Sequence, residues 1–427
     1  MSETVFTYAA PALKYGPGAL DELGHDVAGL GATRALVVTD AGVLATGHPE
    51  RAAQSLRAAG VGAVVHDSAR VEPTDASLLA AVERARAEGT VEAVVAVGGG
   101  SSIDTAKAVS LMLTNPGELM DYVNRPVGGG QAPSRPVLPV VAVPTTTGTG
   151  SESTTICVLD VLQAQVKTGI SHARLRPVLA VVDPELTLSQ PAGVTAAAGM
   201  DILCHALESW TARPYSEFAA KQAHERVPYC GANPIADMWS ERSLRLLAGS
   251  FRRAVADGSD REARGQMALA ATFAGLGFGN AGVHVPHADA YPIAGRVHDI
   301  GSGFRPAGYD VDEAMVPHGM AVALTAPAAF ALTFDADPQR HLAAADWLDP
   351  TGAVTADEPS GRLPAVLTAL MRDIGMPSGL AEVGYGEGDL DGLVEGALQQ
   401  QRLLATAPLE VTGEHLRGVF AASLHLW

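Results

Sequence analysis

The strongest constraint on the fold is a regular alternation of short apolar runs and longer stretches of helical periodicity over the first 185 or so residues. Such an alternation predicts parallel βαβ units, and uninterrupted apolar strands predict a sheet that is covered on both faces. The strand-like runs are Ala35–Thr39, Ala63–His66, Ala93–Val97, Val137–Val143 and Val178–Asp183, and the helical stretches are Pro49–Ala59, Asp75–Glu88 and Ile103–Leu113.

The pattern changes near residue 190. Thr155–Leu159 and Val166–Ile170 predict a hairpin inserted into the α/β part, and beyond Pro191 the strand-like runs fade. We therefore predict an α/β dinucleotide-binding domain with a parallel sheet over residues 1–190 and an all-helical domain over residues 191–427. Examples of the predicted helices of the second domain are Ala196–Thr211, Trp239–Ala256, Glu262–Phe273, Gly319–Phe330 and Arg362–Ile374.

Composition excludes several classes of partner. The 427 residues carry 47 Asp and Glu against 29 Lys and Arg, a net charge of −18, which repels nucleic acid and anionic membranes. No uninterrupted apolar stretch is long enough to predict a bilayer span. Met1–Thr4 has neither the basic nor the apolar region of an export signal, and three widely spaced cysteines do not predict disulfides. We expect a cytoplasmic enzyme with no nucleic-acid or membrane partner.

A glycine-rich turn provides the first candidate site. The strand ending at Val97 runs directly into Gly98, Gly99 and Gly100, and Ser101 and Ser102 precede a predicted helix. Glycines allow the backbone to approach a pyrophosphate, and a helix N-terminus offers free N–H groups. A tight turn alone would need fewer glycines, so phosphate binding is favoured, although the GxGxxG fingerprint is absent.

Two further features follow strand ends in the same half. Pro144–Glu152 is dense in hydroxyl groups that could bind ribose, phosphate or a carboxamide. Asp40 ends another strand, where an acid can accept a hydrogen bond from ribose and repel a 2′-phosphate. The alternative for Asp40, an ordinary turn residue, is equally consistent with its position.

Histidines mark the second half, since six of the 13 lie between residues 201 and 320. Asp201 and His205 are four residues apart and share one helix face. Together with His287 and His318 they would make a mixed nitrogen and oxygen site suited to Fe(II), Zn(II), Ni(II) or Mn(II). Taken singly, each histidine is more typical of a structural residue.

Several of these stretches together resemble the iron-containing (group III) alcohol dehydrogenase family, over nearly the whole chain. The matching stretches are Gly98–Ser101 with Asp104 and Lys107, Pro144–Glu152, Asp183–Leu186, Gly199–Glu208 and Pro317–Gly319. The branch most similar is hydroxyacid–oxoacid transhydrogenase, through Gly231–Trp239, Phe273–His284 and Tyr309–Asp312.

The resemblance implies roles for individual residues. The metal ligands, which are also the catalytic centre, would be Asp201, His205, His287 and His318, with Fe(II) the expected metal and Zn, Ni or Mn the alternatives. NAD would be held by Asp40, Gly98, Gly99, Gly100, Ser101, Asp104, Thr145, Thr146, Thr149, Lys167 and Leu186.

The sequence departs from the family at two places. His287 is followed by Ala288 and Asp289, which predicts an extra carboxylate beside the metal. Tyr291 stands where many members have a further histidine, so it would either donate a proton or simply pack. His284 would be either a partner of His287 or a core residue. Candidate cations for a substrate carboxylate are Arg213, Arg226, Arg242 and Arg296.

The resemblance implies a metal-dependent oxidoreductase that transfers hydride between NAD and a small alcohol or hydroxy acid such as 4-hydroxybutyrate. In the transhydrogenase version an oxo acid takes the hydride back from a retained cofactor. The alternatives are an ordinary NAD-dependent alcohol dehydrogenase, a maleylacetate reductase, or, in another class, a dehydroquinate synthase-like lyase. A homo-oligomer is expected from the family alone.

Overall fold

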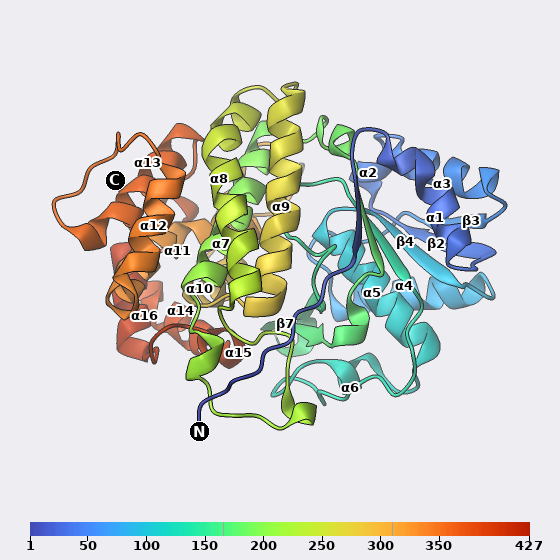
Figure 1. Cartoon of the computed structure of the whole chain (residues 1–427), viewed down its shortest axis with the longest axis horizontal. Helices are drawn as coiled ribbons and strands as arrows, with labels where there is room; N and C mark the ends of the chain where they lie inside the picture. Colours follow the sequence, from blue (N-terminus) through green and yellow to red (C-terminus); the bar gives the residue numbers. More distant parts are fainter. Residues whose placement is uncertain (165, 310) are drawn as a thin grey trace. The chain divides into compact units, whose positions relative to one another are not determined.

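The computed structural model describes residues 1–164, 166–309 and 311–427, and contacts divide the chain into two units. Ala9–Ser189 forms one unit, and Met1–Tyr8 together with Gln190–Trp427 forms the other. The parallel α/β fold and the helical fold predicted for the two halves are both present (Figure 1).

The α/β unit is built on a six-stranded sheet in the order β1-β8-β5-β4-β2-β3, in which all neighbouring strands are parallel. The sequence analysis missed β1, because this edge strand is mostly exposed and has no apolar run. The strands are β1 (Ala12–Tyr15), β2 (Arg34–Val38), β3 (Gly62–His66), β4 (Ala93–Gly98), β5 (Val140–Pro144) and β8 (Leu179–Val182).

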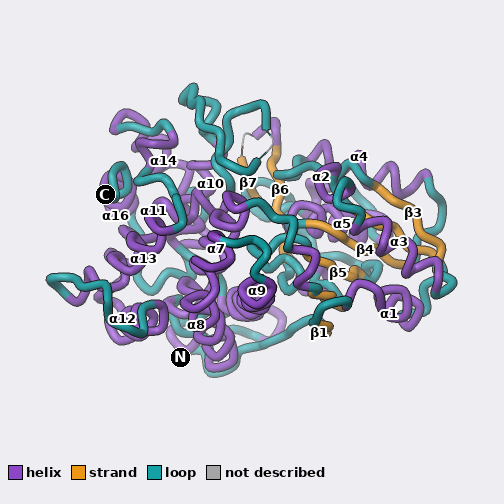
Figure 2. Tube along the Cα trace, turned by 90° about the horizontal axis from the view of Figure 1, so that it is seen from above, coloured by secondary structure: helices purple, strands orange, loops and turns teal. Residues whose placement is uncertain are grey.

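Helices cover both faces of this sheet (Figure 2). Alternate residues of a strand point to opposite faces, so Leu36 and Val38 pack in one core and Ala35 and Val37 in the other. The first core includes α4 (Asp75–Ala87) and α5 (Gly100–Thr114), and the second includes α1 (Leu23–Gly29) and α3 (His48–Ala58). The unit also contains the short helices α2 (Ala41–Leu44) and α6 (Leu119–Tyr122).

The predicted hairpin forms a separate antiparallel pair, β6 (Ile156–Val161) and β7 (Val166–Ser171). Lys167 lies opposite Asp160 in this pair. Gln165, between the strands, is outside the described residues, as is Asp310 of the stretch Tyr309–Asp312.

The helical unit packs around α7 (Ala192–Thr211), most of whose residues are buried. Helices α8 (Pro234–Ala256) and α9 (Arg261–Ala281) lie against it and against each other (Figure 1). The remaining helices are α10 (Val285–Gly295), α11 (His318–Thr333), α12 (Pro338–Leu348), α13 (Arg362–Asp373), α14 (Leu390–Leu398), α15 (Gln401–Leu404) and α16 (Gly413–Ala422).

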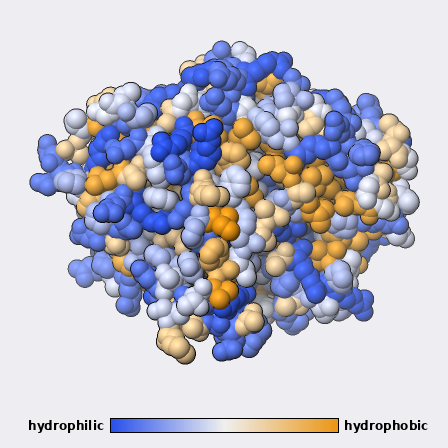
Figure 3. Space-filling view, in the orientation of Figure 1, coloured by the Kyte–Doolittle hydropathy of each residue, from blue (hydrophilic) through white to orange (hydrophobic). Residues whose placement is uncertain are grey.

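One described helical segment, His318–Ala336, is apolar and long enough to cross a membrane by length and composition alone. However, 72% of its most apolar window is buried inside the protein, as in the core helix of a globular unit. Its neighbour α10 meets α9 at a bend of 104°. Hydrophilic residues occupy much of the face shown in Figure 3.

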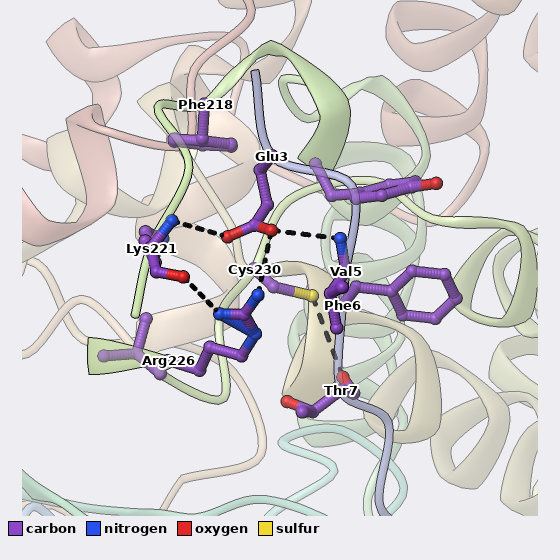
Figure 4. Close-up of a pocket in the computed structure, with 10 residues that line it drawn as sticks. Glu3, Val5, Phe6, Thr7, Phe218, Lys221, Arg226 and Cys230 are labelled. Carbon is purple, nitrogen blue, oxygen red and sulfur yellow. Dashed lines mark hydrogen bonds and ion pairs between the residues drawn. The ribbon is translucent and has the colours of Figure 1, made fainter. Parts of the chain in front are cut away.

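The first eight residues lie with the helical unit, although the sequence analysis assigned them to the α/β part. The buried Glu3 explains the difference (Figure 4). Its carboxylate accepts hydrogen bonds from Val5 N (3.0 Å), Lys221 N (3.0 Å) and the Arg226 guanidinium (3.0 Å). A charged hydrogen-bond network of this kind gives no apolar periodicity, so a pattern analysis does not detect it.

Candidate metal and dinucleotide sites

Three helices of the helical unit bring the predicted ligands together. Asp201 and His205 stand one turn apart on α7, His287 lies in the first turn of α10, and His318 begins α11. Pro286 lies in the first turn of α10, where proline is favoured, and Pro317 is the N-cap residue of α11.

The three imidazoles converge on one carboxylate oxygen of Asp201. Asp201 Oδ1 lies 3.8 Å from Nε2 of His205, 3.5 Å from Nε2 of His287 and 3.9 Å from Nε2 of His318. Ligand atoms of Asp201, His287 and His318 all lie within 4.8 Å of one another, a group that could hold a metal ion. His318 is the most open of the four, with 26% of its side chain exposed, whereas the others are buried.

Burial and charge set the protonation of this cluster. Although burial opposes it, the positive field of the histidines holds the pKa of Asp201 well below its usual range, so that carboxylate is ionised. Burial lowers the pKa of His205 to about 3, which leaves this imidazole neutral. Burial also acts against charge on His287, but Glu208 and Asp201 outweigh it and raise the pKa of His287 to about 9.

Glu208 supports the cluster from behind, a role that the sequence analysis did not assign. This fully buried carboxylate on α7 hydrogen-bonds His287 Nδ1, and its other oxygen accepts from the backbone N–H of His284 (2.7 Å) and of His287 (3.2 Å). Its place seven residues after Asp201, on the same helix face, was the available signal. A carboxylate on Nδ1 fixes the imidazole so that Nε2 faces the other ligands.

Neighbouring rings hold the imidazoles in place. The ring of Phe278 stacks on His205 with centroids 3.9 Å apart and an angle of 7° between the planes. Tyr291 lies on α10 with its ring centroid 6.0 Å from that of His318. His284 is a core residue whose Nε2 pairs with Thr211 Oγ1 at 3.0 Å, while its backbone N–H contacts Glu208.

Asp289 is not part of the group of described ligand atoms that could hold a metal, contrary to the sequence-based expectation. Two residues beyond His287, it lies on another face of α10 because successive helical residues are about 100° apart. The side chain is fully buried, and burial raises its pKa well above the usual range. Thr325 of α11 is the polar side chain beside it.

The cluster meets the chemical requirement for a divalent cation. Asp201 Oδ1 and His287 Nε2 are buried without a hydrogen-bond partner in the described chain. Two buried polar atoms without partners, side by side, are costly. A divalent cation that displaces the Nε2 proton of His287 would satisfy both atoms. The residues therefore fit a metal.

In the α/β unit, β4 leads into α5 through the predicted glycine turn. α5 begins at Gly100, earlier than expected. A Cβ at Gly98 would lie 2.4 Å from Ser102 Oγ, one at Gly99 3.1 Å from Thr146 Oγ1, and one at Gly100 2.7 Å from Thr149 Oγ1. Glycine therefore lets the threonine loop pack on the helix N-terminus, and Thr145 Oγ1 is buried there without a partner in the described part of the chain. The three glycines and the threonine loop thus form a cradle that fits a dinucleotide phosphate.

Asp40 has the turn role that its position allowed. One carboxylate oxygen caps α2 by accepting from Val43 N (2.9 Å), and the other accepts from Ser102 Oγ (3.2 Å). The acid is thus tied to the first turn of α5 and remains partly exposed.

Three other residues that were expected to bind the cofactor have structural partners. Asp104 accepts from Ser151 Oγ (2.6 Å) and Val158 N (2.9 Å), and it lies 3.3 Å from the fully buried ammonium of Lys107. Lys167 pairs with Glu72 and Asp160. Leu186 is buried in the core beneath the sheet.

Comparison with known protein families identifies the family of the chain. Residues 10–184 match iron-containing alcohol dehydrogenase, and residues 195–303 and 309–424 match the C-terminal domain of the Fe-containing alcohol dehydrogenase family. The chain belongs to the iron-containing alcohol dehydrogenase family. It is thus an oxidoreductase, and membership implies a nicotinamide cofactor and a divalent metal.

Individual relatives are similar over nearly their full length. The chain is 42% identical to mitochondrial hydroxyacid-oxoacid transhydrogenase of Xenopus tropicalis and 40% identical to that of Homo sapiens, covering all of this chain and 92% and 91% of those proteins. The crystal structure of a 1,3-propanediol oxidoreductase has a TM-score of 0.84 at 30% identity, covering 98% of this chain and 100% of that one.

These relatives contradict the prediction of a cytoplasmic protein, because they are named as mitochondrial. That prediction depended on the missing features of an export signal at Met1–Thr4. Those features concern secretion and do not test import into an organelle.

The four candidate arginines have other surroundings in the part of the chain that the structure describes. Arg226 pairs with Glu3, and Arg213 covers the ring of Phe218 at 4.7 Å. Arg296 packs over Gly392, and Arg242 is exposed on α8. Their expected role in substrate binding is therefore without support from this geometry.

Proposed function

We propose that the protein exchanges hydride between a hydroxy acid and an oxo acid through a bound nicotinamide. The observation that carries this proposal is a buried Asp/His/His/His cluster in a chain that matches transhydrogenases along its full length. A small 4-hydroxy acid is the proposed donor and a 2-oxo acid the proposed acceptor.

We assign one divalent metal per chain to Asp201, His205, His287 and His318, with Fe(II) as the native ion. The nitrogen and oxygen donor set also accepts Zn(II), Ni(II) and Mn(II), and affinity alone favours Zn(II) over Fe(II). When bound, the metal would supply Lewis acidity to a substrate oxygen and the nicotinamide would carry the hydride.

The chain's own residues prepare this centre. Glu208 holds a proton of His287 on Nδ1, so that Nε2, once a metal displaces its proton, would present its lone pair to the cluster. Asp201 contributes the single negative charge among the four ligands. Phe278 covers one face of the His205 ring and excludes water from it. The exposed edge of His318 leaves one open side for substrate, where Tyr291 is the phenol positioned to orient it.

We assign the cofactor to the cradle of Gly98, Gly99 and Gly100 with Thr145, Thr146 and Thr149, and we propose NAD. A carboxylate at Asp40 facing a 2′-phosphate costs about 4 kcal/mol per charge pair at 4 Å with an effective dielectric constant near 20, before screening. Asp40→Gly should narrow the preference for NAD over NADP, while equal affinities in the unaltered protein would refute the assignment.

The test follows both products in the absence of added NAD. Metal-reconstituted protein is incubated with 4-hydroxybutyrate and 2-oxoglutarate, and the expected result is stoichiometric succinic semialdehyde and 2-hydroxyglutarate. In a second arm, NAD is added. If product forms only in that arm, and only as fast as NAD is reduced, and if plain primary alcohols turn over better, the protein is an ordinary dehydrogenase of this family instead.

A further inference from the structure

The last turn of α9 is poorly suited to form a helix by itself. It contains Gly277 and Gly279 and has Gly282 as its C-cap, and glycine is among the weakest helix formers. Phe278 lies in the same turn and stacks on the imidazole of His205, with ring centroids 3.9 Å apart. Whatever keeps this turn helical therefore also keeps an aromatic ring on one of the candidate metal ligands.

The loop 212–233, between α7 and α8, supplies hydrogen bonds that the end of α9 lacks. The last four carbonyls of a helix have no partner within the helix. The carbonyl of Asn280 accepts from the backbone N–H of Cys230 at 2.9 Å, and the carbonyl of Ala281 accepts from Gly231 N at 3.0 Å. This loop thus caps α9 from outside the helix.

The first eight residues, here called the N-terminal strap, fasten the middle of the same loop (Figure 4). The backbone N–H of Glu3 donates to Phe218 O at 2.8 Å. The Glu3 carboxylate, only 7% exposed, accepts from Lys221 N and from the Arg226 guanidinium, each at 3.0 Å. Arg226 also donates to the carbonyl of Lys221 at 2.8 Å. Glu3 is therefore the anchor around which the middle of the loop closes.

The strap and the end of α9 meet at one side chain of the loop. The thiol of Cys230 lies 3.8 Å from the carbonyl of Thr7 in the strap and 3.2 Å from the carbonyl of Asn280. All of these residues belong to the helical unit. Contacts therefore run from the strap, through the loop, to the last turn of α9.

We infer that Glu3 positions the metal cluster: by fastening the loop that caps α9, it keeps Phe278 on the ring of His205. The inference rests on the proposed function, because it takes His205 to be a metal ligand. Glu3 is a positioning residue, since it acts only through the loop. When Glu3 no longer fastens the loop, the last turn of α9 should open in more of the molecules, and metal affinity should fall with the fraction that stays closed.

The experiment compares Glu3→Gln with the wild type. Glutamine keeps the size of the side chain, but its amide has one oxygen where the carboxylate has two, so its NH2 group must face another donor. Hydrogen exchange at the N–H groups of Cys230 and Gly231, without added metal, should become faster. Zn(II) affinity, titrated against a competing chelator, should fall by about threefold to tenfold, which corresponds to a closed fraction of about a third to a tenth.

Glu217→Gln is the matched control, because Glu217 is exposed in the same loop and should change neither measurement. A double-mutant cycle with Phe278→Leu separates positioning from a general loss of stability. Once the stacked ring is gone, Glu3→Gln should lower Zn(II) affinity no further.

Unchanged Zn(II) affinity in Glu3→Gln, an equal loss in Glu217→Gln, or additive losses in the double variant would overturn the inference alone. A wild-type protein that binds no divalent metal would overturn the metal assignment of the proposed function, and the inference with it.

Discussion

Glu208 is the residue that most clearly distinguishes this cluster from a chance grouping of histidines. It is a fully buried carboxylate whose hydrogen bonds go to His287 Nδ1 and to two backbone N–H groups of the turn that carries His287. A partner of this kind orients a metal-binding imidazole and raises its basicity.

Glu208→Gln should therefore lower metal affinity by about 10-fold to 100-fold, the usual effect of losing such a partner. Glutamine keeps the shape of the side chain, but its amide is neutral and accepts a hydrogen bond from the imidazole N–H more weakly than the carboxylate does. Metal content after dialysis against a graded chelator measures the effect, and Glu395→Gln on the exposed side of α14 is the matched control. Identical metal retention in the two variants would contradict the role assigned to Glu208.

Asp289 leads to a prediction about pH. Because burial raises its folded-state pKa, the folded protein holds a proton that the unfolded chain loses above about pH 4. Between these two pKa values the residue costs stability as pH rises, by at most about 1.4 kcal/mol per pH unit.

Asp289→Asn removes this dependence, so its stability relative to the wild type should increase as the pH rises above about 5, up to the raised pKa of Asp289 in the folded protein. Urea unfolding at a series of pH values measures the difference. A constant difference over that range would show that Asp289 is ionised in the folded protein.

At the scale of elements, glycines decide how closely helices approach the metal cluster. Gly277 of α9 is buried, and a Cβ there would lie 2.7 Å from Ser240 Oγ of α8 and 3.1 Å from Ser209 Oγ of α7. The next residue is Phe278, which stacks on His205. Gly249 of α8, by contrast, lies on the exposed side of its helix, where a Cβ would meet nothing within 4 Å in the described chain.

The same substitution should thus have opposite effects at the two glycines. Gly249→Ala should stabilise the protein by roughly 0.5–1 kcal/mol, because alanine loses less backbone entropy in a helix. Gly277→Ala should destabilise it by about 1–3 kcal/mol through overpacking, and metal affinity should fall with it. Thermal unfolding measures both, and a stabilising Gly277→Ala would refute the close packing described for α9.

Hydrophobic periodicity predicted the core strands and several helices that bury one apolar face. It did not predict segments whose packing depends on small residues or on burial from all sides. The core strands and the parallel sheet follow from apolar runs such as Ala93–Val97. The glycine-rich end of α9 was not predicted as helix, because glycine is a poor helix former and only the contacts of Gly277 explain its presence there. α10 was missed because it is buried on all sides and has no amphipathic pattern.

The candidate site, too, was predictable from the sequence only in part. The resemblance to the family supplied the cluster of Asp201, His205, His287 and His318, since no spacing rule links residues on three helices. The orientation of Asp289 and the partners of Lys167 could not be predicted, because each depends on which neighbours the fold brings to that side chain.

At the scale of the whole molecule, the edge of the sheet supports the proposed homo-oligomer. Strand β1 pairs only with β8 among the described strands, and Leu13, Tyr15 and Val178 are 42%, 40% and 42% exposed. An unprotected strand edge with apolar side chains is a common place for association. Light scattering should find an assembly larger than one 43.9 kDa chain, and Leu13→Lys should shift it toward monomer. A monomeric wild type would exclude this proposal.

The central claim is that one nicotinamide carries hydride from the hydroxy acid to the oxo acid. The most direct measurement uses 4-hydroxybutyrate deuterated at C4 with unlabelled 2-oxoglutarate, without added NAD, and mass spectrometry of the product. The account predicts 2-hydroxyglutarate with one deuterium at C2, and its loss in His287→Ala. Product without deuterium, or undiminished transfer by a metal-free His287→Ala variant, would contradict it.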